Sequence, residues 1–69
     1  MFEQVGQTGL KLAVEKDGQN RPIATVMDYR GNVVATATRQ GVTHYGNPTP
    51  DLITRIQTAL VPYEERLKV

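Results

Sequence analysis

Nothing in this 69-residue chain can cross-link it, because Cys is absent and His44 is the single histidine. Disulfides and thiolate zinc sites are therefore excluded, and one imidazole cannot build a metal site by itself. A chain this short buries about 60% of the surface that its unfolded form exposes, so one core has little to spare. We therefore expect its stability to come from an efficient core or from association with another chain.

The clearest local pattern is the alternation of apolar and polar residues over 10–16. Leu10, Leu12 and Val14 share one face, as a half-buried strand requires. The Asp17-Gly18 pair that follows is favoured in tight hairpins, because both residues tolerate positive φ. Two more strands are predicted, over 23–29 and 33–39, and the short turns between the three strands indicate an antiparallel meander.

A helix is predicted after the meander. Thr49 is suited to the N-cap, Pro50 to the first helical position, and Asp51 to the positive end of the helix dipole. Apolar residues then recur at helical spacing to Leu67. Pro62 interrupts this stripe and lacks an N–H, so we expect the helix to be kinked or broken there.

These elements predict a single α+β domain, a three-stranded antiparallel β-meander followed by one C-terminal helix. Its parts are an irregular lead-in (1–9), the meander (10–39), a loop (40–49) and the helix (50–68). One helix covers one face of such a sheet, whereas the second and third strands are apolar on both sides. The other face is then covered either by residues 1–9 or by a second chain. In the second case we expect a homodimer, with Ala24, Val26 and Val34 in the interface.

The residues give little support for catalysis. The chain has no Ser and no Cys, and Thr43 beside His44 is not a signature of nucleophilic catalysis. A meander followed by a helix is similar to the opening of the ribonuclease H-like fold, and Asp17-Gly18 resembles its first metal-binding aspartate. However, that fold has an acidic residue within its helix, where this chain reads Leu52-Ile53-Thr54-Arg55. We expect no enzyme activity, no metal and no cofactor.

The loop 40–49 and its flanks are the best candidates for recognition. Arg39, His44, Tyr45 and Asn47 offer a cation, a titratable ring, an aromatic and an amide, and Arg30 lies in the other turn. Tyr and Arg are enriched among interface hot spots. Alternatively, Tyr45 folds back on the helix N-terminus and closes the core.

We expect a small protein-binding module that acts by occupying the surface of a partner protein. Compact, cysteine-free chains of this size resemble small inhibitors made by phages and mobile elements. The alternative is a nucleic-acid-binding module that uses the turn arginines and loop aromatics, although the net charge is only +1. The β-β-β-α order is similar to the later part of a double-stranded RNA-binding domain, but Asp51 replaces its basic helix start. Residues 1–9 lack a secretory pattern and no apolar run could span a membrane, so we expect a cytoplasmic protein.

Overall fold

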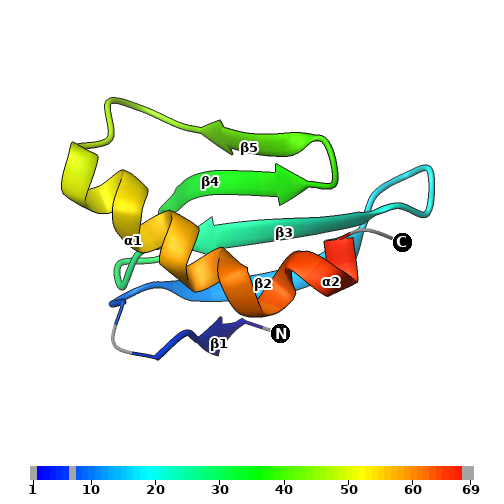
Figure 1. Cartoon of the computed structure of the whole chain (residues 1–69), viewed down its shortest axis with the longest axis horizontal. Coiled ribbons are helices and arrows are strands. Elements are labelled where there is room, and N and C mark those ends of the chain that lie inside the picture. Colours follow the sequence, from blue (N-terminus) through cyan, green and yellow to red (C-terminus); the bar gives the residue numbers. More distant parts are fainter. Residues whose placement is uncertain (1, 7, 68–69) are drawn as a thin grey trace.

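The computed structural model describes residues 2–6 and 8–67. Its strands form one antiparallel sheet in the order β1-β2-β3-β4-β5, and the C-terminal helical segment lies across it (Figure 1). The strands are β1 (Glu3–Gln4), β2 (Lys11–Lys16), β3 (Pro22–Met27), β4 (Val33–Thr38) and β5 (Gly41–His44). The helices are α1 (Pro50–Leu60), the 3₁₀ turn η1 (Val61–Tyr63) and α2 (Glu64–Leu67).

The predicted three-stranded meander is wrong, because the sheet has five strands; the α+β class is correct. The lead-in 1–9 contains β1, which pairs Glu3 with Leu12 and Gln4 with Lys11. The predicted loop 40–49 contains β5, which pairs with β4 from Thr38↔Gly41 to Ala35↔His44. Both added strands are short, with two and four residues, and neither shows a hydrophobic alternation.

The turns that join β2 to β3 and β3 to β4 have the same hydrogen bonds. In the first, the Asp17 carboxylate accepts from the N–H groups of Gln19 (2.8 Å) and Arg21 (3.0 Å). In the second, Asp28 accepts from the residues two and four positions on, both at 2.9 Å. The fourth residue of each turn has positive φ, 64° at Asn20 and 87° at Gly31. In each loop, three residues lie between the aspartate and the residue with which it pairs at the start of the next strand. Neither loop is therefore a two-residue Asp-Gly turn.

The helical layer follows the sequence signals. Thr49 caps α1, since its hydroxyl accepts from the N–H of Leu52 at 3.1 Å, and Pro50 is the first helical residue. α1 ends at Leu60, and Pro62 lies in the 3₁₀ turn that connects it to α2. The predicted break near Pro62 is thus present, and α2 continues far enough to bury Leu67.

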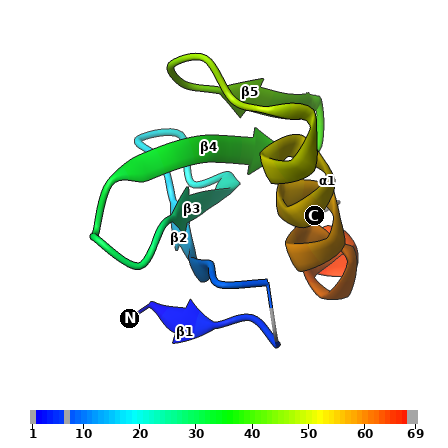
Figure 2. The same cartoon turned by 90° about the vertical axis from the view of Figure 1, so that its left-hand side faces the viewer.

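The core lies between the helical layer and one face of the sheet, the covered face (Figure 2). Register places two rows of side chains on this face, Leu12–Val26–Ala35–His44 and Val14–Ala24–Ala37–Val42. Ala24, Val26 and Ala35 are fully buried, as are Ile56 and Ala59 of α1. The alanines of β3, β4 and α1 have little side-chain volume, so they allow the helix to approach the sheet closely.

The lead-in extends the sheet instead of crossing its other face. β1 lies beside β2 at the sheet edge (Figure 2), and Val5 packs against the core. The chain returns to β2 through a turn in which the Thr8 hydroxyl donates to the carbonyl of Val5 (2.6 Å) and Gly9 has a φ of 74°. The face of the sheet opposite the helices, the open face, therefore has no covering element within the described residues.

Candidate interaction surface

The open face carries a row of small side chains that runs across the sheet. Register aligns Ala13 with Thr25, Thr25 with Thr36, and Thr36 with Thr43. Thr25 is half-buried at the centre of the row, and Thr43 is exposed at the edge. The row thus offers hydroxyl groups that can donate and accept hydrogen bonds.

Apolar side chains flank this row. Ile23 and Met27 lie two residues to either side of Thr25 and are half-buried, and Val33, the partner of Met27, is 45% exposed. At the β1 side, the β1–β2 register continued by one residue beyond Glu3↔Leu12 places Phe2 opposite Ala13. Ala13 is only 3% exposed although no helix covers it, so its larger neighbours on this face already shield it.

Two tyrosines stand at one end of the open face. The Tyr45 hydroxyl lies 3.4 Å from that of Thr36, and Tyr45 is 50% exposed. Tyr45 therefore lies toward the open face and does not fold back on the helix to close the core. Tyr29 is 72% exposed in the β3–β4 turn, where the Arg30 guanidinium donates to its hydroxyl and stands 5.4 Å from its ring centroid. Large aromatics exposed in this way are typical of binding surfaces.

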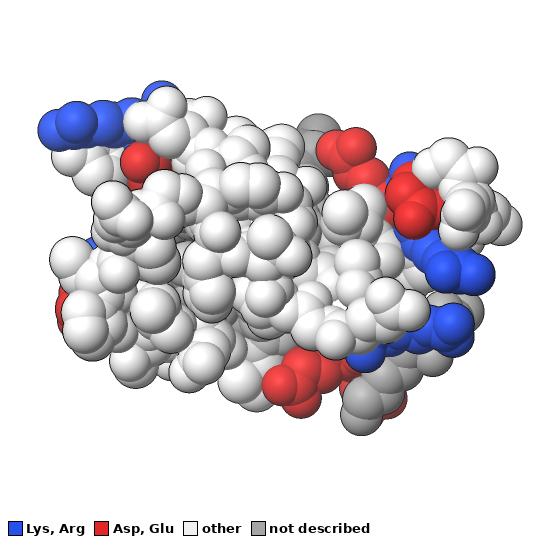
Figure 3. Space-filling model, turned by 90° about the horizontal axis from the view of Figure 1, so that it is seen from above, with Lys and Arg blue, Asp and Glu red and all other residues white. Residues whose placement is uncertain are grey.

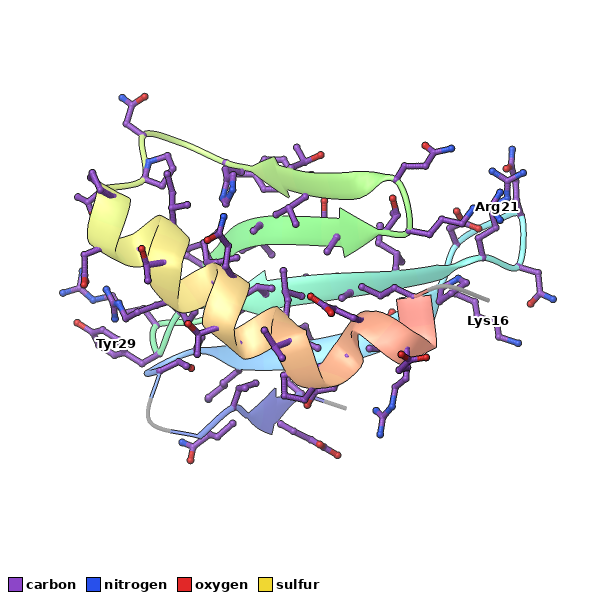
Figure 4. The ribbon with its side chains drawn as sticks, in the orientation of Figure 1. Lys16, Arg21 and Tyr29 are labelled. Atoms are coloured by element: carbon purple, nitrogen blue, oxygen red, sulfur yellow. The ribbon has the colours of Figure 1, made fainter. Side chains whose placement is uncertain are left out.

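Charged groups lie mainly at the two ends of the strands. Figure 4 shows Lys16 and Arg21 at one end of the sheet and Tyr29 at the other. The strands place one cation and one anion on the open face itself, Lys11 and Glu15. These two charges offset each other, so the open face has no strong electrostatic preference for a polyanion.

The two turn aspartates have lowered pKa values. The pKa of Asp17 is lowered mainly by the hydrogen bond from the backbone N–H of Arg21, and further by that from Gln19. The N–H of Asn32 is the largest cause at Asp28, and the N–H of Arg30 adds to it, so that its pKa is lowered although desolvation opposes the shift. Both carboxylates thus hold their turns by accepting backbone N–H groups.

The structure separates the residues predicted to bind a partner. Arg30 lies in the β3–β4 turn, near the end where β5 continues into Tyr45 and the exposed Asn47. Arg39 lies in the β4–β5 turn at the opposite end, where it lines a small hollow with Arg21 and Asp17. The side chain of His44 is on the covered face, and its Nδ1 is shielded from solvent with no hydrogen-bond partner in the described part of the chain. These residues therefore do not form one continuous surface.

The residues predicted for a dimer interface lie away from the open face. Ala24 and Val26 are fully buried beneath the helical layer, and Val34 is half-buried against the core. For Ala24 and Val26 the physical reason is the register of the β2–β3 hairpin, which aligns Val26 with Leu12 and Ala24 with Val14. Val34 lies at an irregularity of the β3–β4 register, where Val26 pairs with Ala35 and Met27 with Val33. The apolar positions on the open face are instead Ile23 and Met27, which sequence reasoning did not select.

The described residues contain no group of three or more His, Asp or Glu side chains that could hold a metal ion. No helix among them has the length and apolar character needed to cross a membrane. Comparisons with family models, with curated proteins and with solved structures find no match to this chain.

Proposed function

We propose that this protein is a small binding module whose open sheet face occupies the surface of a partner protein. The observation that carries the proposal is the composition of that face: a hydroxyl-rich row, half-buried Ile23 and Met27, exposed Val33, and two tyrosines at one end. Contiguous apolar and aromatic surface without a covering element is typical of protein interfaces. The proposed occupant is correspondingly a largely uncharged, flat protein surface.

A protein fits this face better than a nucleic acid. Phosphate recognition depends on an excess of cations along the bound strand. Lys11 is balanced by Glu15 on the open face, and Arg21 and Arg39 line a hollow that also contains Asp17. The tyrosines suit base stacking as well as protein contact, so nucleic-acid binding is one outcome that the experiment must separate.

Occupying a partner's surface is the way in which a small inhibitor acts. We include in the proposal that the partner is a host protein, of the kind blocked by phage or mobile-element inhibitors, and that both proteins meet in the cytoplasm. The mechanism would be steric: a rigid sheet covers a surface that the partner needs for another contact.

The test compares capture of proteins from a lysate of the source cell by the wild-type chain and by variants of the open face. Thr25→Lys places a charge at the centre of the face, and Tyr45→Ala removes an exposed aromatic from its edge. Gln57→Lys adds the same charge on the exposed side of α1 and is the matched control. Circular dichroism first establishes that each variant is folded.

The proposal predicts that a protein captured by wild type and by the Gln57→Lys variant is lost with Thr25→Lys. With that protein purified, titration calorimetry should show its Kd raised about tenfold or more by Tyr45→Ala, the loss typical of a hot-spot aromatic. Equal capture by all four proteins would contradict the assignment of the face. Salt-sensitive binding of single-stranded oligonucleotides, without a protein ligand, would replace it with the nucleic-acid alternative.

A further inference from the structure

β5 is an edge strand whose outward backbone groups have no partner in the sheet. The N–H of Tyr45 donates to the carbonyl of Val34 at 3.0 Å. This bond determines which residues of β5 point their backbone groups toward β4. In an antiparallel ladder, alternate residues point their N–H and C=O groups toward the same neighbour. Thr43 and Gly41 therefore bond to β4, whereas the backbone groups of Val42 and His44 point away from the sheet. Those groups form a template for another strand.

The two edges of the sheet differ in how they are protected. β1 has two residues, and one of them is the exposed, charged Glu3. β5 has four residues, Gly41 to His44, with no Lys, Asp, Glu or Pro among them. Seen from the β5 side, the centre of the view carries no acidic or basic side chain; most charges lie toward the two ends, and acidic atoms also lie at the lower margin between them (Figure 3). Short edges and charged edges prevent strand pairing, so β1 is protected and β5 is not.

We propose that β5 pairs with β5 of a second copy of this chain, antiparallel and about a two-fold axis through Thr43. In this register Val42 of each copy faces His44 of the other, and each such pair exchanges both of its N–H···O bonds. Thr43 faces Thr43 of the second copy in the closely spaced pair without backbone bonds, and a cross-strand Thr–Thr pair of this kind contributes to stability. A second copy fits because the strand is uncharged, so that pairing like with like brings no equal charges together.

The pairing has a defined consequence for the shape of the assembly. A two-fold axis perpendicular to the sheet keeps each face on its own side, so two five-stranded sheets join into one of ten strands. The helical layers of both copies then lie on one side, and the two open faces form one continuous surface on the other. Val42, which is 41% exposed and borders a groove with Leu60 and Leu67, becomes covered at the junction.

Sedimentation equilibrium of the full chain tests the pairing independently of any partner protein. The expected result is a concentration-dependent dimer of twice the 7.7 kDa chain mass. Thr43→Lys sets two ammonium groups against each other across the axis and should raise the dimer Kd about tenfold or more. Gln4→Lys adds the same charge at the β1 edge and should leave the Kd unchanged. A monomeric wild type at millimolar concentration, or equal dimerisation of both variants, would overturn the proposal.

Hydrogen exchange provides a second measurement that needs no variant. In wild type, the amides of Val42 and His44 should become protected as concentration rises, whereas those of Thr43 and Tyr45, which bond to β4, are protected throughout. Free exchange of Val42 and His44 at every concentration would exclude the β5 pairing even if a dimer forms elsewhere. Since neither experiment includes a partner protein, failure of this inference leaves the proposed function standing, and the reverse also holds.

Discussion

Truncation of one residue on each face of β3 tests which face of the sheet is covered. Val26 is 0% exposed beneath the helical layer, and Val26→Ala removes two methyl-sized groups. At about 0.8 kcal/mol for each group, with a further contribution from the cavity left behind, the free energy of unfolding should fall by about 2 to 3 kcal/mol. Ile23→Ala removes more carbon, but from a half-buried side chain on the open face, and should cost only about 1 kcal/mol.

Urea unfolding followed by circular dichroism measures both costs, with all proteins at one concentration because association adds to apparent stability. A chain of this size has a free energy of unfolding of about 3 to 10 kcal/mol in total. Both losses are therefore measurable, and at the lower end of this range Val26→Ala unfolds the chain. The order of the two costs is the decisive result. If Ile23→Ala were the more destabilising change, the two faces of the sheet would have to be exchanged and the proposed binding surface with them.

Two further predictions concern the hairpin turns. Gly31→Ala should lower the free energy of unfolding by about 1 to 2 kcal/mol, because its φ is 87° and open space surrounds the added Cβ, so the cost is one of backbone conformation alone. Gly18→Ala, also in open space but without positive φ, should be neutral or stabilising by a few tenths of a kcal/mol; equal urea midpoints for the two variants would contradict the turn geometry. The lowered pKa values of Asp17 and Asp28 mean that their contribution to stability is complete above the ordinary Asp pKa of about 3.9 and is lost as pH falls through the lower folded values. The doubly substituted Asp17→Asn, Asp28→Asn protein keeps acceptor oxygens that do not titrate. Its free energy of unfolding should therefore depend less on pH below about pH 4 than that of wild type. Parallel pH profiles of the two proteins would refute this assignment.

The helix was predictable from sequence because its signals are local. Thr49, Pro50 and Pro62 each act through their own backbone, so the start of α1 and the break after it lie where the residues indicate. The three central strands were predictable as well, from the alternation in β2 and the β-branched residues of β4. The two outer strands were not, because β1 and β5 are held by pairing with neighbours that local patterns do not reveal.

The face on which Ala24 and Val26 lie depends on one turn. A two-residue loop at Asp17-Gly18 would pair Leu12 with Ile23 and set Ile23 on the covered face. The observed loop is longer by an odd number of residues, so Leu12 pairs with Val26 and every side chain of β3 lies on the other face. The signal was present in the sequence: Asp17 and Asp28 are each followed by a glycine or asparagine suited to positive φ three positions on, Asn20 and Gly31.

The two-faced sheet underlies both proposals, and nuclear Overhauser contacts between side-chain methyl groups test it most directly. We predict contacts from the methyls of Leu12 and Val26 to Ile56, which share the buried core. The methyls of Ile23 and Met27 should show none to α1. A strong contact between Met27 and Ile56 would mean that the helix covers the surface assigned here to partner binding.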